Sequence, residues 1–366
     1  MHTQLSTQAT MPSLTVYLGA IVAVAAVYLA ISDQADGIIR LFYPKPNFTR
    51  ADVNPANVKN KIFLITGANS GLGFASAKLL AEAGGIVIMA ARDKVKGQAA
   101  ADQVTAAGLS RGRDGRAVFL PLDLADHKSI KQFALEVQKQ FKRIDVLMLN
   151  AGIMATDFGA TKDGFELQAG VNHFGHFYLT ELLLDMLVRS KNPTRIVSLT
   201  SGGHFLWSDA AMDVNEFRAD HPANRDRRDM MWKWKFYGRS KLLNILHMKT
   251  LSDRLQAAKV SHIYCNAAHP GSVATELFED FTGSFVFKHF GTLIAVVVGQ
   301  MPVEYGVLTQ LYAAVSPDIE EKNIRGQYLT PLVRITRPSD LALNTTLGDQ
   351  LFDYSKRVVA EWERTG

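Results

Sequence analysis

The stretch TGANSGLG, Thr66 to Gly73, decides how this chain folds. It follows a short apolar run and precedes a helical pattern at Ala75 to Ala83. Three glycines let the backbone turn tightly and approach a pyrophosphate, and the helix N-terminus presents N–H groups and a partial positive charge to that anion. Between a strand and a helix that open a βαβ series, the loop predicts a dinucleotide site rather than a structural turn.

Outward from this loop, short apolar runs alternate with longer amphipathic segments such as Ser129 to Phe141. Near-continuous apolar runs are typical of parallel strands that are covered on both faces. The alternation predicts right-handed βαβ units, hence an α/β fold with a doubly wound parallel sheet of the Rossmann type, in a single large domain at residues 56–366. The predicted strands are KIFLIT, GIVIMAA, AVFLPLD, IDVLMLN, RIVSLT, VSHIYCN and a last short one, GQYLTP.

The bulk composition fits a folded domain and argues against several classes of protein. The 366 residues are 47% hydrophobic, and the formal net charge of +5 is too diffuse to indicate a nucleic-acid partner. The single cysteine, Cys265, cannot form a disulfide within the chain. No Cys/His cluster has zinc spacing, so no metal site is expected. The oligomeric state stays open, with a homo-oligomer as one alternative.

Residues 1–55 are predicted to hold a tail, a membrane anchor and a linker. LTVYLGAIVAVAAVYLAI, at residues 14–31, carries no charge and is about long enough for a single transmembrane helix. A cleaved secretory signal is the alternative. Arg40, Lys45 and Arg50 follow this run and no Lys or Arg precedes it. The positive-inside rule therefore predicts a single-pass protein whose large domain faces the cytosol, in the endoplasmic reticulum or a similar membrane.

Several motifs resemble those of the short-chain dehydrogenase/reductase family, over nearly everything after the linker. TGANSGLG is similar to the fingerprint T-G-x-x-x-G-x-G, and LNAG is similar to N-N-A-G, with Leu149 in place of the first Asn. VNHFGHF, SLTSGGH, YGRSK and HPGSVATEL follow in the family's order. DGFELQAGVNHFGHFYLT is most similar to the membrane-associated retinol dehydrogenase branch.

The resemblance implies a bound nicotinamide dinucleotide. Asn150 would steady the central sheet, backbone groups near Pro270 would bond the carboxamide, and Thr275 would reach the diphosphate. Asp123 would contact the adenine ring, although alone it could equally belong to the cap of a helix near Asp126. The residues expected at the cofactor are Gly67, Asn69, Ser70, Gly71, Leu72, Gly73, Arg92, Asp123, Leu124, Asn150, Ala151, Gly152, Tyr237, Lys241, Pro270, Gly271, Val273 and Thr275.

The end of the second predicted strand, IMAARD, favours NADP(H) over NAD(H). An NAD enzyme usually carries Asp or Glu at this tip to bind the ribose 2′-OH. Here Ala90 and Ala91 stand at the tip and Arg92 follows. A guanidinium suits a 2′-phosphate through bidentate, charge-assisted hydrogen bonds. The alternatives are a solvated Arg92, or Asp93 turned in to bind a 2′-OH.

The stretch YGRSK places the Tyr237 phenol and the Lys241 amine on one face of a helix. A tyrosine is a poor base at neutral pH because its reference pKa is about 10. We therefore expect the nearby ammonium to lower the pKa of Tyr237. Tyr237 then exchanges a proton with the substrate oxygen while hydride moves to or from carbon. Alone, such a pair is more often a structural feature of a helix surface.

The resemblance implies the catalytic residues Asn172, Ser201, Tyr237 and Lys241. Ser201 would orient the carbonyl oxygen, with Thr200 and Ser198 as alternatives, and Lys241 would hold the nicotinamide ribose. Asn172 would hold a water that connects Lys241 to solvent, and its alternative is a helix-interior amide bonded to backbone.

Two further segments bear on the substrate. The charged, Trp-rich segment between Ser201 and Tyr237 is predicted to be a solvated excursion, with a substrate wall or a membrane-facing rim as alternatives. The apolar and aromatic stretch at residues 277–301 has a charge-free part that is too short to span a bilayer, and it predicts a lid over an apolar substrate.

The sequence therefore predicts a membrane-anchored, NADP(H)-dependent oxidoreductase that interconverts a carbonyl and an alcohol. The partner is an apolar small molecule of the retinoid, steroid or lipid kind. One rival is a light-dependent pigment double-bond reductase, because VIMAARD resembles the second strand of protochlorophyllide reductases. The other is a non-catalytic dinucleotide-binding membrane scaffold. Replacement of the catalytic Ser, Tyr or Lys would indicate the scaffold, and all three residues are present.

Overall fold

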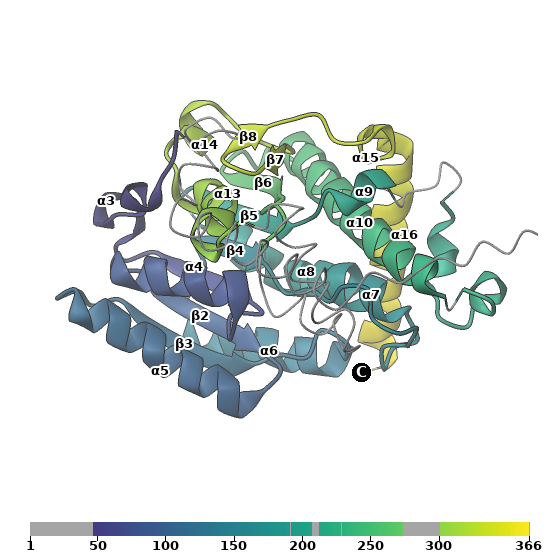
Figure 1. Cartoon of the computed structure of the whole chain (residues 1–366), viewed down its shortest axis with the longest axis horizontal. Coiled ribbons are helices and arrows are strands. Elements are labelled where there is room, and N and C mark those ends of the chain that lie inside the picture. The colour runs from purple at the N-terminus through teal and green to yellow at the C-terminus, as the bar shows by residue number, and fades with distance from the viewer. Residues whose placement is uncertain (1–46, 191, 207–211, 228, 274–300, 366) are drawn as a thin grey trace, which may run out of the picture. The chain divides into compact units, whose positions relative to one another are not determined.

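A sheet of eight strands organises the residues that this computed structural model describes, which are 47–190, 192–206, 212–227, 229–273 and 301–365. Its strand order is β3-β2-β1-β4-β5-β6-β7-β8 (Figure 1). Neighbouring strands are parallel except for β7 and β8. The strands are β1 (Ile62–Thr66), β2 (Ile86–Ala91), β3 (Arg116–Pro121), β4 (Val146–Leu149), β5 (Thr194–Leu199), β6 (Ile263–Ala268), β7 (Tyr328–Thr330) and β8 (Arg334–Ile335).

The seven predicted strands are confirmed, and their apolar character has the expected cause. Phe63, Leu64 and Ile65 of β1 are fully buried, because helices cover both faces of the sheet. The strand β8 was not predicted. Its two residues are exposed and pair antiparallel with β7, so they leave no apolar run in the sequence.

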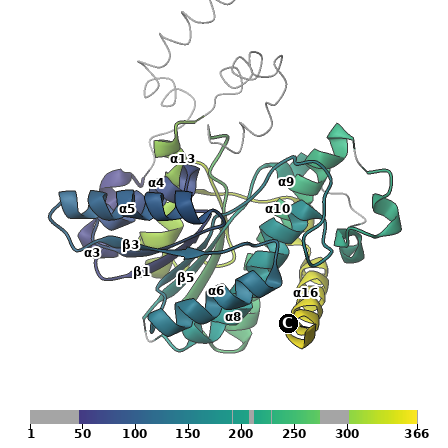
Figure 2. The same ribbon diagram turned by 90° about the horizontal axis from the view of Figure 1, so that it is seen from below.

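Helices pack on both faces of the sheet (Figure 2). One face carries α4 (Gly71–Glu82), α5 (Lys94–Ser110) and α13 (Val303–Val315). The other carries α6 (His127–Gln140), α8 (Gly175–Val188) and α10 (Met230–Ala257), and α16 (Thr345–Thr365) packs along α10. The shorter helices are η1 (Arg50–Asp52), α3 (Pro55–Val58), α7 (Leu167–Ala169), η2 (Gly170–Phe174), α9 (Gly203–Leu206), η3 (Val214–Phe217), η4 (Pro222–Asn224), α14 (Asp318–Glu321) and α15 (Asp340–Leu343).

The strand order reverses between β1 and β4, each of which starts a run of neighbours in the opposite direction. The helices that follow β1 and β4 therefore pack on opposite faces of the sheet. A crevice opens between these helices, beside the carboxyl ends of the two strands. Ligands of doubly wound sheets bind in this crevice, so the topology alone indicates where a site should lie.

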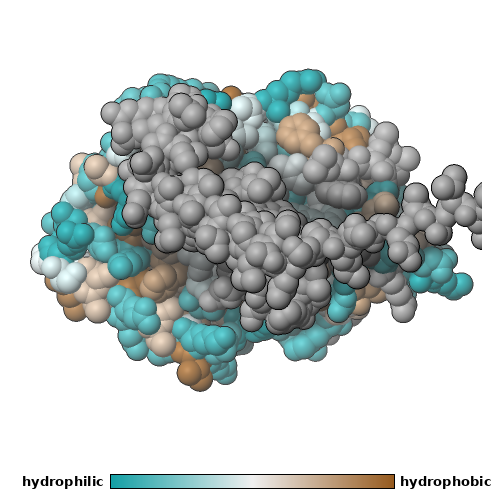
Figure 3. All heavy atoms as spheres, viewed as in Figure 1, coloured by the Kyte–Doolittle hydropathy of each residue, from teal (hydrophilic) through white to brown (hydrophobic). Residues whose placement is uncertain are grey.

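Among the described residues, no helix combines the length and the apolarity needed to cross a bilayer. The anchor expected at residues 14–31 lies outside the described residues, as does the expected lid apart from Met301. On the face in Figure 3, hydrophilic residues dominate the described surface and apolar ones are scattered among them, which is ordinary for a folded domain.

The described part of the segment between Ser201 and Tyr237 packs against the domain. Phe217 is fully buried, and its carbonyl oxygen accepts a hydrogen bond from Glu166 N at 2.8 Å. The Glu216 carboxylate accepts from Arg227 at 2.6 Å and from the buried Arg239 of α10 at 2.9 Å. The expectation of a solvated excursion holds only in part for residues 212–227. Most residues there are exposed or half-buried, but Phe217 is buried and Glu216 faces the buried Arg239 guanidinium.

The pKa of Glu216 reflects the same contacts. Partial burial raises this pKa, but the hydrogen bonds from Arg227 and Arg239 outweigh burial and hold it below its ordinary value. Glu216 is therefore ionised at neutral pH, as the buried Arg239 requires.

We expect Glu216→Gln to lower the free energy of unfolding by about 3 kcal/mol, because it removes the negative charge that faces a buried guanidinium. Glu361→Gln is the matched control, since it removes the carboxylate that pairs with the partly exposed Arg218. The control should cost less than about 1 kcal/mol. Urea unfolding of both variants measures the difference, and equal losses would contradict the anchoring role of Glu216.

Candidate active site

A cleft of about 520 Å³ opens where the strand order reverses, beside the carboxyl ends of β1 and β4. Most of the residues that the sequence assigns to a dinucleotide line this cleft. They are Gly67, Asn69, Ser70, Gly71, Leu72, Arg92, Asp123, Leu124, Asn150, Ala151, Gly152, Tyr237, Lys241 and Pro270. Gly73, Gly271 and Val273 do not line it, and Thr275 lies outside the described residues.

The glycine loop is shaped for close backbone approach. Gly67 has a φ of +64°, and a Cβ added there would lie 2.8 Å from Ala151 Cα. A Cβ on Gly73 would lie 2.3 Å from the Gly67 carbonyl oxygen, so Gly73 supports the loop from behind. Ser70 precedes α4 in an extended conformation, and its side chain makes no capping hydrogen bond. The first-turn N–H groups of α4 therefore remain for an anion.

Asn150 ties the glycine loop to the end of β4. Its side-chain Nδ2 donates to the carbonyl oxygens of Thr66 at 2.8 Å and of Gly67 at 3.2 Å. Its main-chain N–H donates to Thr66 Oγ1 at 2.9 Å. One residue thus fixes the two strand ends that border the cleft.

The end of β2 presents a cation to the cleft. Arg92 lines the cleft and is exposed, and no ion pair engages its guanidinium in the part of the chain that the structure describes. The neighbouring Asp93 points elsewhere, because its carboxylate caps α5 by accepting from Val95 N at 2.9 Å and Lys96 N at 3.0 Å. Of the alternatives for this tip, Asp93 turned in toward a ribose does not fit this geometry.

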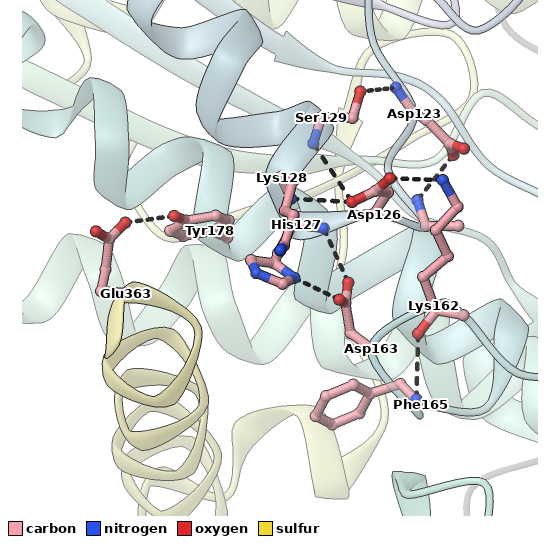
Figure 4. Close-up of polar contacts among 12 residues, drawn as sticks. Asp123, Asp126, His127, Lys128, Ser129, Lys162, Asp163, Phe165, Tyr178 and Glu363 are labelled. Carbon is pink, nitrogen blue, oxygen red and sulfur yellow. Dashed lines mark hydrogen bonds and ion pairs between the residues drawn. The ribbon is translucent and has the colours of Figure 1, made fainter. Parts of the chain in front are cut away.

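The two aspartates in the loop after β3 have different hydrogen-bond partners (Figure 4). Asp126 caps α6, where its carboxylate accepts from Lys128 N at 3.0 Å and Ser129 N at 3.4 Å. Asp123 accepts locally from Ala125 N at 3.0 Å and lines the cleft. The cap therefore belongs to Asp126, which leaves Asp123 on the side of a ligand.

Ser201 and Tyr237 meet beside Gly203. A Cβ added to Gly203 would lie 3.5 Å from Tyr237 Cε1 and 3.6 Å from Ser201 Oγ, so the Ser201 hydroxyl and the phenol ring lie close together. The two alternative hydroxyls are placed differently. Thr200 donates its hydroxyl to the Lys241 carbonyl oxygen at 2.7 Å, and Ser198 is buried within β5. Ser201 is therefore the hydroxyl that faces the phenol.

Lys241 and Asn172 meet beside Gly152. A Cβ on Gly152 would lie 3.1 Å from Lys241 Nζ and 3.2 Å from Asn172 Oδ1. Lys241 Nζ lies 5.6 Å from the centroid of the Tyr237 ring and donates to the Leu199 carbonyl oxygen at 3.3 Å. The α10 helix thus brings the amine under the phenol, as the four-residue spacing predicts.

Burial pushes both groups toward their neutral forms. It raises the pKa of Tyr237, although the nearby Ser201 hydroxyl acts in the opposite direction. It lowers the pKa of Lys241 to about 8. The expectation that the ammonium lowers the pKa of Tyr237 is therefore wrong for the free protein, because loss of hydration around the buried phenol exceeds the attraction of a charge that is itself penalised by burial.

The Asn172 side chain is engaged with backbone. Its Oδ1 accepts from Ile153 N at 2.8 Å, and its Nδ2 donates to the Ile153 carbonyl oxygen at 2.9 Å and to Ser240 Oγ at 2.9 Å. Asn172 lies in η2, a π-helical turn, and such turns are frequent at functional sites. Its amide matches the alternative of a helix-interior amide bonded to backbone.

His176 joins the two halves of the site and was not predicted. Its Nδ1 donates to the Asn172 carbonyl oxygen at 3.0 Å, and its Nε2 accepts from Thr66 Oγ1 at 2.9 Å. Burial lowers the pKa of His176 to about 4, so the ring stays neutral at pH 7. A histidine one helical turn after Asn172 was the only hint in the sequence.

The surface beside the phenol is apolar. Met154, Ala155 and Tyr237 form one buried cluster, and the partly buried Trp234 packs against it. The rings of Trp234 and Tyr237 meet edge to face with their centroids 6.3 Å apart. A substrate oxygen at the Tyr237 hydroxyl would therefore carry its apolar part along this wall.

Known proteins resemble this chain in sequence and in fold. Residues 61–207 match the short chain dehydrogenase family. Retinol dehydrogenase 14 of Mus musculus is 35% identical over 84% of this chain and 90% of its own length. The chloroplastic short-chain dehydrogenase TIC 32 B of Brassica napus is 33% identical over 83% of this chain and 90% of its own length.

A solved structure agrees with these relatives. The crystal structure of an uncharacterised protein from Mycobacterium paratuberculosis superposes with a TM-score of 0.63 and 31% identity, over 84% of this chain and 97% of the other. The chain thus belongs to the short chain dehydrogenase family, in its retinol dehydrogenase-like branch, and is an oxidoreductase that acts on alcohol or carbonyl groups with a nicotinamide dinucleotide.

Proposed function

We propose that the protein uses NADP(H) to interconvert an apolar carbonyl and its alcohol, with Tyr237 as proton donor in the direction of reduction. The observation that carries this proposal is the buried Tyr237 phenol, which lies beside Ser201 and above Lys241 in a cleft lined by the glycine loop. A proton donor, an orienting hydroxyl and a dinucleotide cradle are the parts that carbonyl reduction needs.

The bound dinucleotide supplies or accepts the hydride. Ser201 orients the substrate oxygen, and Tyr237 gives that oxygen a proton in reduction or takes one in oxidation. The raised pKa of Tyr237 supports the donor role, because the phenol stays protonated at neutral pH until a substrate oxygen needs the proton. Lys241 holds the nicotinamide ribose. Asn172 holds the relay water through its main-chain carbonyl oxygen. This oxygen accepts one hydrogen bond from His176 and has a second lone pair that can accept another from the water.

Arg92 supports NADP(H) over NAD(H). Its guanidinium lines the cleft at the tip of β2, where Ala90 and Ala91 offer no carboxylate to repel a 2′-phosphate. Asp93, the nearest acid in sequence, is occupied as the cap of α5. A charge-assisted pair between Arg92 and the 2′-phosphate is therefore the contact that would select the cofactor.

The apolar wall supports an apolar substrate. Met154, Ala155 and Trp234 adjoin the phenol, and residues 14–31 carry an uncharged apolar run suited to an anchor. We place the anchor, at residues 14–31, in the membrane and the reductase domain, at residues 56–366, on the cytosolic side. The end of the expected linker belongs with this domain, because Phe48 is buried against Tyr312. An enzyme held at a bilayer receives a lipid-like carbonyl from the phase in which it dissolves.

Tyr237→Phe tests the function, because it removes one hydroxyl and keeps the ring. We expect turnover of apolar aldehydes and ketones with NADPH to fall by about a thousandfold, while the Kd for NADPH stays unchanged. Tyr178→Phe is the matched control, since it removes another buried tyrosine hydroxyl, one that donates to Glu363 outside the cleft. Absorbance of NADPH follows turnover, and wild-type turnover in Tyr237→Phe would rule out the proton-donor role.

Arg92→Ala tests the cofactor preference. We expect the Kd for NADPH to rise by about thirtyfold, because a charge-assisted contact with the 2′-phosphate is lost. The Kd for NADH should change by less than about twofold, since NADH has no phosphate at that position. Titration of cofactor fluorescence measures both, with Lys94→Ala as a control outside the cleft lining. Equal weakening of both cofactors would contradict the assignment.

A further inference from the structure

Two buried amides lie four residues apart at the start of the segment that leads into α8. Gln168 belongs to α7 and Asn172 to η2, so both side chains project from the same side of one continuous helical segment. Asn172 is already placed beside Lys241. Gln168 is only 1% exposed, and neither the reaction nor the cofactor accounts for it.

Gln168 makes the same kind of bridge as Asn172. Its Oε1 accepts from Ala155 N at 2.9 Å, and its Nε2 donates to the Lys233 carbonyl oxygen at 2.9 Å. Since one partner can only donate and the other can only accept, the amide has a single orientation. The side chain therefore joins the loop after β4 directly to α10.

The two amides form hydrogen bonds with α10, one before and one after Tyr237 in the sequence. Gln168 bonds Lys233, four residues before the tyrosine, and Asn172 bonds Ser240, three residues after it. On the loop, Asn172 bonds Ile153 and Gln168 bonds Ala155. The helix and the loop are thus held together at two levels, one on each side of the phenol.

The residues around the Gln168 bridge are apolar. Met154 and Ala155 on the loop and Trp234 on α10 form the wall beside Tyr237. Ala155 has a φ of +49°, a conformation that costs free energy in a residue other than glycine and persists only where surrounding contacts enforce it. The exposed Asp157 also forms an ion pair with Lys233, so a second contact joins the loop after β4 to α10.

We propose that Gln168 is a positioning residue for the substrate side of the site. It holds Met154 and Ala155 in place against Trp234, and so fixes the shape of the apolar wall along which an apolar substrate lies beside the Tyr237 hydroxyl. Asn172 holds the loop against α10 in the same way on the side of Lys241 and the dinucleotide. This assignment rests on the proposed function for its effect on substrate, whereas the bridge itself is a property of the fold.

Gln168→Met tests the proposal, because methionine keeps the length of the side chain and makes neither hydrogen bond. We expect backbone hydrogen exchange at Ala155 and over residues 231–236 to speed up by about tenfold, because Ala155 N–H loses its acceptor. The Kd for NADPH should stay within about twofold of wild type. The KM for a bulky apolar carbonyl should rise by about tenfold, while kcat/KM for a small aldehyde changes by less than about twofold.

Two further variants separate positioning from stability. Gln168→Glu keeps the Oε1 acceptor, so Ala155 should remain protected from exchange. Gln138→Met makes the same substitution at an exposed glutamine that bonds the Leu182 carbonyl oxygen, and it should leave exchange at Ala155 and all kinetic constants unchanged.

Unchanged exchange at Ala155 in Gln168→Met, or equal losses with large and small carbonyls, would overturn the proposal. If the wild-type protein reduced no carbonyl at all, the proposed function would fail, while exchange would still decide whether the bridge exists.

Discussion

The hydroxyl of Thr66, at the end of β1, is the point on which the site depends. It accepts N–H groups from Asn150 at 2.9 Å and Ala151 at 3.0 Å, and it donates to His176 at 2.9 Å. A strand end that borders a crevice leaves main-chain groups without ladder partners, and buried groups of this kind must be satisfied. Here one hydroxyl satisfies two of them. Through His176 it also reaches the Asn172 carbonyl oxygen, so the glycine loop and the residues around Lys241 are parts of one buried network.

Burial sets the electrostatics of the reacting pair more strongly than the charge between them does. It raises the pKa of Tyr237 and lowers the pKa of Lys241 to about 8. Lys241 therefore keeps most of its charge at neutral pH and loses it as the pH rises through about 8. The phenol keeps its proton over the same range. In the proposed function, this protonated phenol is the group that gives a proton to the carbonyl oxygen.

Sequence patterns predicted the parts of the molecule that depend on local rules. Apolar runs located β1 to β7, and the glycine spacing located the dinucleotide crevice, because strand burial and tight turns leave their mark on neighbouring residues. Contacts between distant residues left no such mark. His176 meets Thr66 across 110 positions, Gln168 meets Lys233 across 65, and Glu216 meets Arg239 across 23. The direction of the pKa of Tyr237 was missed for the same reason, since burial is a property of the whole fold.

The buried phenol of Tyr237 is protonated and lies beside the dinucleotide cleft. Ultraviolet titration of the phenolate, taken as wild type minus Tyr237→Phe in the free protein, measures its protonation most directly. We predict no phenolate absorbance from Tyr237 below a pH of about 10, because burial holds its pKa above the reference value. Phenolate that forms near neutral pH without any cofactor would contradict the account, since the lysine charge would then outweigh burial.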